Sequence, residues 1–385
     1  MKRKQEPERV KPSPFHYGRT WSRGCLVGQG SFGSVFIATL KKPIPPYINL
    51  PPYMAVKSAE VSVSGSLQRE KQVLDNLRRC PHIIRCFGEE LTVTGNGESI
   101  FNIFLEYACG GTIADQIKVS SSGRLREVDV RHFTRSILQG LKYVHECGYV
   151  HCDLKPDNIL LVPITGTDDF VAKIGDFGLA KRANEGQRRH LRGTPMYLSP
   201  EAVVEYLQES PSDIWALGCV VLEMLTGKKP WEMEPDMINV QRLMHRIGSV
   251  HESPYVPSEI PEEAKDFLKC CFVREPVYRF TAEMLLNHPF VAGPNEDEGK
   301  VGDLEEVSDA ESVGSTLSFP KADDDAKLGH SSSPSELSFI PLEDFTCYTD
   351  QVVLPPLGEE RLEFLKRRRA VITSSSIIPK GIMCL

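Results

Sequence analysis

The sequence predicts an α+β fold in which a small β-rich lobe is followed by a larger, mainly helical lobe. Three observations support this prediction. Strand-like apolar segments lie together in residues 21–107, and helix-period patterns dominate residues 108–291. From residue 292 to residue 385 the chain becomes acidic and rich in serine, which predicts a largely disordered tail with a short basic patch. Residues 1–20 are polar, basic and proline-containing, and we expect a flexible arm there.

The small lobe combines several strands with one helix. The segment CLVGQGSFGSVFIATL at 25–40 predicts two short strands around a glycine-rich turn, and YMAVKSAE at 53–60 predicts a third strand. Residues 41–52 between them are rich in proline, which interrupts strand pairing, so they are expected to form a loop. Apolar residues recur at helical spacing in 66–80, and IFNIFLEY at 100–107 predicts a buried strand.

The larger lobe is predicted from two helical patterns. Residues 130–148 place four apolar side chains on one helical face, namely Phe133, Ile137, Leu141 and Val144. Residues 212–227, SDIWALGCVVLEMLTG, are apolar almost all round, which is typical of a helix buried on every side. We therefore expect this second helix at the centre of the lobe.

The charge distribution excludes some classes of protein. The 385 residues include 45 basic and 52 acidic ones, a formal net charge of −7. Residues 294–330 alone contain 11 acidic and three basic residues, so the acidity belongs to the tail. A generic nucleic-acid binder normally carries a basic excess, and we expect no nucleic-acid partner. The sequence has no run of 18 apolar residues, so no membrane span is expected.

Cysteine usage and targeting signals predict a cytoplasmic protein. The 11 cysteines are odd in number and include no Cys-x-x-Cys pair, which favours free thiols over disulfides or a zinc site. The N-terminal segment is positively charged but is followed by no apolar stretch, unlike a secretory signal. The basic run at 366–369 leaves nuclear import open, although such runs are also common on exposed helices.

The tail has two interpretations. Its acidic, serine-rich composition favours a solvated spacer. The segment SFIPLEDFTCY at 338–348 is apolar enough to bind a groove, so a docking or inhibitory segment, or a regulatory partner for the tail, is the alternative.

A glycine-rich motif precedes the predicted third strand. Gly28, Gly30, Gly33 and Val35 form G-x-G-x-x-G-x-V, which fits either a simple tight turn or a loop whose backbone amides cradle phosphates. The third glycine leads into a strand and not into a helix, which disfavours a Rossmann dinucleotide site.

Lys57 lies in an otherwise apolar strand. A lone lysine is usually a solvated edge charge, but a buried ammonium needs an anionic partner. Glu70 on the following predicted helix is the candidate. Together these two side chains could hold the α- and β-phosphates of a nucleotide.

The segment HCDLKPDN at 151–158 has the most specific chemistry. Asp153 and Asn158 lie in a loop interrupted by a proline, and Asp176 follows in DFG. Carboxylate and amide oxygens suit a hard cation such as Mg²⁺, and a second carboxylate can orient a hydroxyl nucleophile. His151 could be a general base, but we expect a packed histidine that supports the loop.

These segments, in this order, resemble the eukaryotic protein kinase domain. GQGSFGSV resembles its glycine-rich loop, AVK its third-strand lysine, HCDLKPDN its catalytic loop and DFG its metal-binding turn. Ser199-Pro200-Glu201 resembles the Ala-Pro-Glu end of the activation segment, Asp213 its buried loop-bracing aspartate, and Arg279 the arginine that pairs with that glutamate. The resemblance covers residues 21–291 and implies the two-lobed kinase fold, divided near residue 107.

The resemblance also implies the roles of individual residues. Asp153 would orient the substrate hydroxyl and accept its proton, and Lys155 would steady the transferring phosphoryl group. Lys57, paired with Glu70, would hold the phosphates of ATP, and Asn158 and Asp176 would bind Mg²⁺. The adenine pocket would be formed by Val27, Val35, Ala55, Leu160 and the hinge residues Glu106 and Ala108, with Leu105 as gatekeeper.

Finer motifs indicate a branch of the family. Lys155 and the segment GTPMYLSPE resemble the Ser/Thr class, and FLEYACGGTIADQI resembles plant MEKK-like mitogen-activated protein kinase kinase kinases. The implied substrate is a mitogen-activated protein kinase kinase. Two alternatives stay open, a Ser/Thr kinase outside that cascade and a pseudokinase scaffold. A scaffold would normally have lost a member of the catalytic set, and this sequence contains all of them.

Two departures from the family pattern concern regulation. Cys152 replaces the arginine of the usual His-Arg-Asp, which normally pairs with an activation-loop phosphate. Between Gly178 and Gly193 the chain contains no Ser, Thr or Tyr. Thr194 follows, and the family uses that threonine structurally near Asp153. We therefore expect a kinase domain that is active without phosphorylation of this loop.

Overall fold

The computed structural model describes residues 21–30, 33–41, 50–167, 169–185, 191–231 and 240–292. The predicted arm at 1–20, the acidic tail with its apolar segment, and the basic run at 366–369 lie outside the described residues. Within the described ranges, no helix has both the length and the apolar character needed to cross a membrane.

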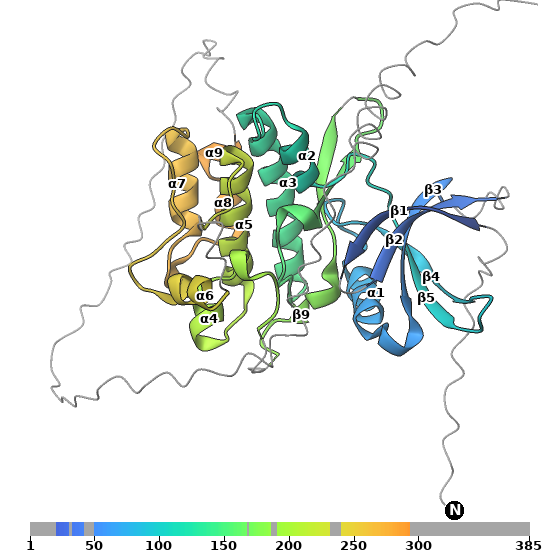
Figure 1. Cartoon of the computed structure of the whole chain (residues 1–385). Helices are drawn as coiled ribbons and strands as arrows, with labels where there is room; N and C mark the ends of the chain where they lie inside the picture. Colours follow the sequence, from blue (N-terminus) through green and yellow to red (C-terminus); the bar gives the residue numbers. More distant parts are fainter. Residues whose placement is uncertain are drawn as a thin grey trace, which may run out of the picture. The chain divides into compact units, whose positions relative to one another are not determined.

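The N-terminal lobe is a five-stranded antiparallel sheet with one helix against it (Figure 1). The strand order is β1-β2-β3-β5-β4. The strands are β1 (Trp21–Gly30), β2 (Gly33–Leu40), β3 (Tyr53–Glu60), β4 (Cys86–Val93) and β5 (Ser99–Leu105). The helix α1 (Gly65–Leu77) buries Leu67, Leu74 and Leu77, as its apolar spacing predicted. Sequence reasoning missed β4, whose residues are mostly only half-buried.

Strand β3 divides its side chains between two apolar clusters. Met54 and Val56 belong to a small cluster with Trp21 and Phe104. Ala55 belongs to the main cluster, which continues into the second lobe. Because successive side chains of a strand point to opposite faces, Lys57 shares the face of Ala55. The alternation in YMAVKSAE thus directs the lysine toward the space between the lobes.

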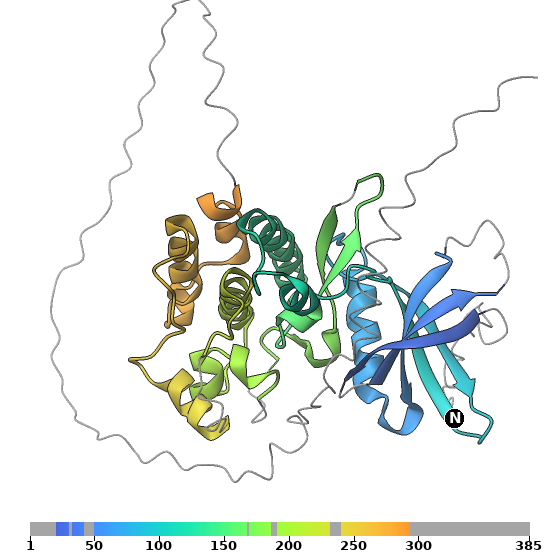
Figure 2. The same ribbon diagram turned by 45° about the horizontal axis from the view of Figure 1, so that its top comes forward.

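The C-terminal lobe is mainly helical. Its helices are α2 (Ile113–Val119), α3 (Glu127–Glu146), α4 (Pro200–Glu205), α5 (Ser210–Thr226), α6 (Val240–Gly248), α7 (Glu262–Cys271), α8 (Ala282–Leu286) and α9 (Pro289–Ala292). Helix α5 is buried from Ser212 to Leu225, which explains its lack of a polar face. Figures 1 and 2 both show α3 beside α5. The expected α+β fold with two lobes is confirmed.

Four short strands of the second lobe flank the loops that contain Asp153 and Asp176. They form the antiparallel pairs β6 (Tyr149–Val150) with β9 (Lys181–Arg182) and β7 (Ile159–Pro163) with β8 (Phe170–Ile174). The main chain of Ile174 in β8 also bonds to the segment before β4: the Ile84 amide donates to the Ile174 carbonyl at 3.0 Å, and the Ile174 amide donates to the His82 carbonyl at 2.9 Å. These bonds join the second lobe to the first directly beside the loop after β8.

Candidate active site

Lys57, Glu70 and Asp176 form an ionic cluster between the lobes, in which Lys57 and Glu70 are buried and the Asp176 side chain is 34% exposed. The Lys57 Nζ lies 2.7 Å from the Glu70 Oε2 and 2.8 Å from the Asp176 Oδ1. Glu70 is 1% exposed because it lies on the inward face of α1, between the buried Leu67 and Leu74. The partner that the sequence suggested for Lys57 is therefore in place, and Asp176 joins it from the second lobe.

Burial and mutual attraction set the charges of this cluster. Burial disfavours the Lys57 ammonium, but the two carboxylates outweigh it and raise the pKa of Lys57. Burial raises the pKa of Glu70, and the nearby charge of Asp176 adds to this increase. The attraction of Lys57 lowers the pKa of Glu70 but offsets only part of the increase. For Asp176, burial acts in the same direction, but Lys57 outweighs it and the pKa is lowered. One ammonium is thus shared by two carboxyl groups. Asp176, whose pKa is lowered, holds its negative charge more strongly than Glu70, whose pKa is raised.

Asp153 lies in the loop between β6 and β7 with its carboxylate oriented from two sides. The Asp153 Oδ1 accepts hydrogen bonds from the Thr194 amide at 2.9 Å and the Thr194 hydroxyl at 2.7 Å. The Asp153 Oδ2 lies 3.1 Å from the Lys155 Nζ and accepts from the Asn158 Nδ2 at 3.1 Å. Lys155 also donates to the Thr194 hydroxyl at 2.8 Å. These contacts hold Asp153 and Lys155 in one polar group.

A single carboxylate, Asp213, braces the main chain of this loop. It accepts from the amides of His151 at 2.8 Å and Cys152 at 3.0 Å, and it lies 2.9 Å from the His145 Nε2. Burial would raise the pKa of Asp213, but the hydrogen bond to His145, with the nearby His151, lowers it. The loop is therefore fixed to the first turn of α5, where Asp213 lies.

His151 supports the loop and is remote from solvent. Its side chain is fully buried, its Nε2 lies 3.1 Å from the Gly175 carbonyl oxygen, and its ring stands edge-on to Phe177 at 4.8 Å between centroids. This arrangement agrees with a packed histidine and not with a general base. It also ties the catalytic-loop segment to the segment that contains Asp176.

Two non-glycine residues of the site adopt left-handed backbone conformations. Cys152 has φ of 67° and Asp176 has φ of 58°. Such conformations are uncommon for residues with a Cβ and persist where the surroundings over-determine them. At Cys152 the constraint comes from Asp213, and at Asp176 from Lys57 and from the Gly178 amide, 3.4 Å from its Oδ1.

Asn158 and Asp176 each have a side-chain oxygen that accepts none of the hydrogen bonds found among the described residues, and such oxygens suit a hard cation. Asn158 uses its amide nitrogen for its side-chain hydrogen bonds, both of which go to Asp153. Asp176 uses Oδ1 for its contacts with Lys57 and Gly178. Among the described residues, these side chains therefore each keep one oxygen outside the hydrogen-bond network, and carboxylate and amide oxygens are ligands for divalent cations of this kind.

The residues predicted around adenine form part of one apolar cluster. Ala55 and Leu105 are buried in it and pair across β3 and β5, while Val35, Ala108 and Leu160 pack against it partly exposed. Val27 lies half-buried on β1. Apolar side chains of this kind, some buried and some half-exposed, are typical of the lining of a site for a planar heterocycle. Whether each residue contacts adenine stays a prediction.

The three glycines of the G-x-G-x-x-G motif differ in their steric surroundings. A Cβ added to Gly33 would lie 2.5 Å from the Ser58 carbonyl oxygen, and Gly33 has φ of 138°. A Cβ on Gly28 would make only an ordinary contact with Val35, and one on Gly30 would meet open space. Of these three positions, packing within the lobe therefore requires glycine only at Gly33. Close approach of a ligand stays the predicted reason for Gly28 and Gly30.

A hinge contact escaped the sequence analysis. Glu106, one of the expected hinge residues of the adenine pocket, has an ionic partner: the Lys173 Nζ in β8 lies 2.8 and 2.9 Å from its two carboxylate oxygens. Both side chains are largely buried. The two residues are 67 positions apart, and no sequence motif links them. This pair fixes the hinge to the second lobe.

The pairing expected at the end of the activation segment is present. Arg279 donates from Nη1 and Nη2 to the two carboxylate oxygens of Glu201, at 2.7 and 2.9 Å. Its guanidinium lies over the ring of Trp215, 5.2 Å from the centroid. Glu201 lies in the first turn of α4, so this ion pair anchors the last part of the segment to the helical core.

Comparison with known proteins agrees with this geometry. A family model described as a protein kinase domain matches residues 21–291. Mitogen-activated protein kinase kinase kinase 20 of Arabidopsis thaliana is 42% identical over 298 residues, covering 76% of this chain and 84% of that protein. Mitogen-activated protein kinase kinase kinases 17 and 18 of the same plant are each 39% identical, covering 70% of this chain and 69% and 77% of those proteins.

Proposed function

The chain belongs to the protein kinase family as a Ser/Thr kinase, and we propose that it uses ATP and Mg²⁺ to phosphorylate a mitogen-activated protein kinase kinase. The observation that carries the proposal is the presence of two polar groups, Lys57–Glu70–Asp176 and Asp153–Lys155–Asn158, whose segments are joined by the contact of His151 with the Gly175 carbonyl. The substrate class rests on the three similar plant proteins, each of which is named for that tier of the cascade.

The proposed reaction is transfer of the γ-phosphoryl group of ATP to a Ser or Thr hydroxyl. The hydroxyl oxygen forms a bond to the γ-phosphorus, the bond from that phosphorus to the bridging oxygen breaks, and ADP leaves with the electron pair. Asp153 accepts the hydroxyl proton, and Lys155 offsets the charge of the transferring group. Lys57, oriented by Glu70, holds the remaining phosphates. A divalent cation bound by Asn158 and Asp176 would neutralise phosphate charge.

The proposal also includes the location of the protein. Nine cysteines lie in the part of the chain that the structure describes, and all are free thiols, which supports a cytoplasmic site of action. Two other functions are outcomes of the experiment below: a Ser/Thr kinase with a different protein substrate, and a scaffold that binds partners without phosphoryl transfer.

The test is a phosphorylation assay with the purified full chain, labelled ATP and a panel of catalytically inactive mitogen-activated protein kinase kinases. We expect Asp153→Asn to lower the rate about 10²–10⁴-fold, since a general base contributes that much. Asp169→Asn, at an exposed position beyond β7, is the matched control and should keep the wild-type rate. Full activity of Asp153→Asn would refute the assigned catalytic loop. A silent wild type that still binds partners would support the scaffold.

A further inference from the structure

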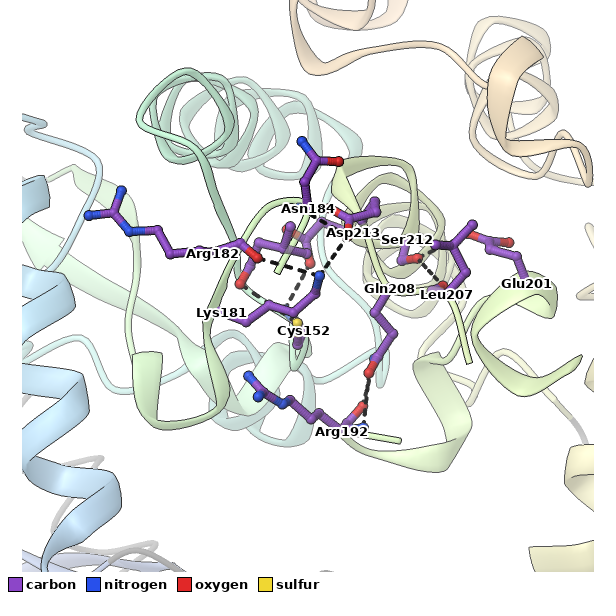
Figure 3. Close-up of polar contacts among 12 residues, drawn as sticks. Cys152, Lys181, Arg182, Asn184, Arg192, Glu201, Leu207, Gln208, Ser212 and Asp213 are labelled. Atoms are coloured by element: carbon purple, nitrogen blue, oxygen red, sulfur yellow. Dashed lines mark hydrogen bonds and ion pairs between the residues drawn. The ribbon is translucent and has the colours of Figure 1, made fainter. Parts of the chain in front are cut away.

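The segment that follows Asp176 is tied to a short turn before α5. We define the activation segment as residues 176–201 and the clamp turn as residues 207–209. Lys181 in β9 lies with its Nζ 2.6 Å from the Glu209 Oε1. The Asn184 amide donates to both carboxylate oxygens of Glu209, at 3.3 and 3.2 Å. Figure 3 shows Lys181 and Asn184 among the polar contacts around Cys152 and Asp213. The first part of the activation segment is thus bound by one carboxylate.

The same turn binds the later part of the activation segment. The Arg192 amide donates to the Gln208 Oε1 at 3.0 Å, and the Gln208 Nε2 donates to the Arg192 carbonyl at 2.8 Å (Figure 3). Gln208 is 7% exposed and Arg192 is half-buried, so this reciprocal pair is partly shielded from water. The Arg192 guanidinium in turn donates to the Leu179 carbonyl at 3.2 Å. The adjacent side chains of Gln208 and Glu209 therefore bind the activation segment at two places, residues 181–184 and Arg192.

The clamp turn is connected to the catalytic loop. The Ser212 amide donates to the Glu209 carbonyl at 2.8 Å, and the Ser212 hydroxyl contacts Glu201 at 3.0 Å. Asp213, the next residue, accepts from the amides of His151 and Cys152. A shift of the clamp turn would therefore be transmitted to the loop that carries Asp153.

Cys152 contributes no charge to this arrangement. Its side chain is 7% exposed, and its Sγ faces the Val150 carbonyl at 3.7 Å. Burial raises the pKa of the thiol, with the nearby Asp213 adding to the effect, so the group stays neutral at physiological pH. With no guanidinium at 152 and no hydroxyl at 179–192, a phosphate on this stretch has neither an attachment point nor an arginine at Cys152 to receive it.

We propose that Glu209 and Gln208 are positioning residues that hold the activation segment in its active arrangement without phosphorylation. Glu209 supplies a permanent negative charge for Lys181, where a phosphate would otherwise serve. This inference rests on the proposed kinase function and adds the means by which its activation segment is ordered.

The test compares full-length wild type, Glu209→Gln and the exposed control Glu205→Gln after phosphatase treatment and removal of the phosphatase. Mass spectrometry verifies that no phosphate remains. Initial rates on an inactive mitogen-activated protein kinase kinase should be linear from time zero for the wild type and for the control. Glu209→Gln should lose about tenfold or more in kcat/KM for the protein substrate, as expected for one lost charged hydrogen bond. Its KM for ATP should stay within about twofold, because no described clamp contact involves the Lys57 cluster.

A charge reversal separates positioning from general damage. Lys181→Glu alone places two acids opposite each other and should lower kcat/KM at least as much as Glu209→Gln. Combining it with Glu209→Lys restores the attraction and should recover most of the lost activity. A melting curve for each variant identifies any protein that has failed to fold. In that case Gln208→Glu is measured instead. This substitution keeps the size of the side chain but loses the amide donor to the Arg192 carbonyl.

The possible failures are distinguishable. A wild type that phosphorylates no kinase substrate refutes the proposed function. An active wild type whose rate starts near zero and rises as Thr194 or another site is phosphorylated refutes the clamp alone. Unchanged kinetics of Glu209→Gln, or no recovery in the reversed pair, also overturns the clamp and leaves the kinase function standing.

Discussion

Two ion clusters, a partly buried one at the lobe interface and a fully buried one inside the C-terminal lobe, differ in their balance of charge. At the interface, Lys57 faces two carboxylates, Glu70 and Asp176. In the C-terminal lobe, Arg279 faces one carboxylate, Glu201, through two parallel hydrogen bonds. The other hydrogen bonds of the guanidinium go to backbone carbonyls, those of Pro211, Val273 and Arg274.

From this difference we predict that the Glu201–Arg279 pair stabilises the fold and that the Lys57 cluster serves catalysis. The Glu201–Arg279 pair is electrically balanced, and its partners all lie within one lobe. The Lys57 cluster has one more acid than base, and Asp176 reaches it from the opposite lobe. A cluster with excess negative charge is incomplete on its own, and a cation or a polar substrate can complete it.

The largest effect is expected from Arg279→Met. It would leave the Glu201 carboxylate buried without a cation, which costs about 3–5 kcal/mol in buried pairs of this kind. Denaturant unfolding of the full chain should show a clearly lower midpoint than the wild type. Arg126→Met, at a side chain that is 83% exposed, is the control and should leave the midpoint unchanged. Equal midpoints for the two variants would contradict a structural role for the pair.

Lys57→Met should instead cause a large loss of activity and little loss of stability. Activity should fall about 100-fold or more, the usual consequence of removing a charged group that binds the transition state. Stability should change little, because burial already raises the pKa of Glu70 and that acid can take up a proton when Lys57 is removed. Unfolding midpoints and initial rates on the same preparations check both points. A loss of stability as large as that of Arg279→Met would break the comparison.

The smallest effect should come from removing a single acid at each cluster. Glu70→Gln removes the charge of an acid whose pKa is raised, so the free energy of unfolding should not decrease. Its activity should fall about tenfold, because a hydrogen bond between charged groups is lost. Glu201→Gln leaves Arg279 buried without a counter-charge and should lower stability. Both variants are measured by denaturant unfolding. Stability changes of the same sign would show that the two clusters do not differ in kind.

Residues that sequence reasoning located share a feature: their partners lie in recognisable motifs. Lys57 needed an acid within reach of a strand, and the next helix contained Glu70. Asp153 and Asn158 occur in one eight-residue segment, and the structure brings them within hydrogen-bond distance. The fold was equally accessible, since the apolar character of residues 212–227 could only be satisfied inside a helical lobe.

The contacts that escaped prediction are long-range pairs of ordinary surface-type residues. Lys173 with Glu106, and Lys181 with Glu209, are separated by 67 and 28 positions and belong to no motif. Composition and periodicity do not specify which lysine meets which glutamate, because that depends on how loops pack after the helices have formed. Strand β4 was missed for a related reason: as an edge strand it lacks a continuous apolar face.

The carboxylate of Glu209 has a consequence for the duration of a signal. A phosphate is a reversible mark that phosphatases erase within the lifetime of the protein, whereas a glutamate side chain persists until the chain itself is destroyed. If Glu209 orders the activation segment, each newly synthesised molecule is switched on as it folds, and no phosphatase can reset this part of it. The interval of signalling would then be set by the rates of synthesis and proteolysis. The strength of the signal would depend on the number of enzyme molecules in the cell and not on the fraction of them that is phosphorylated.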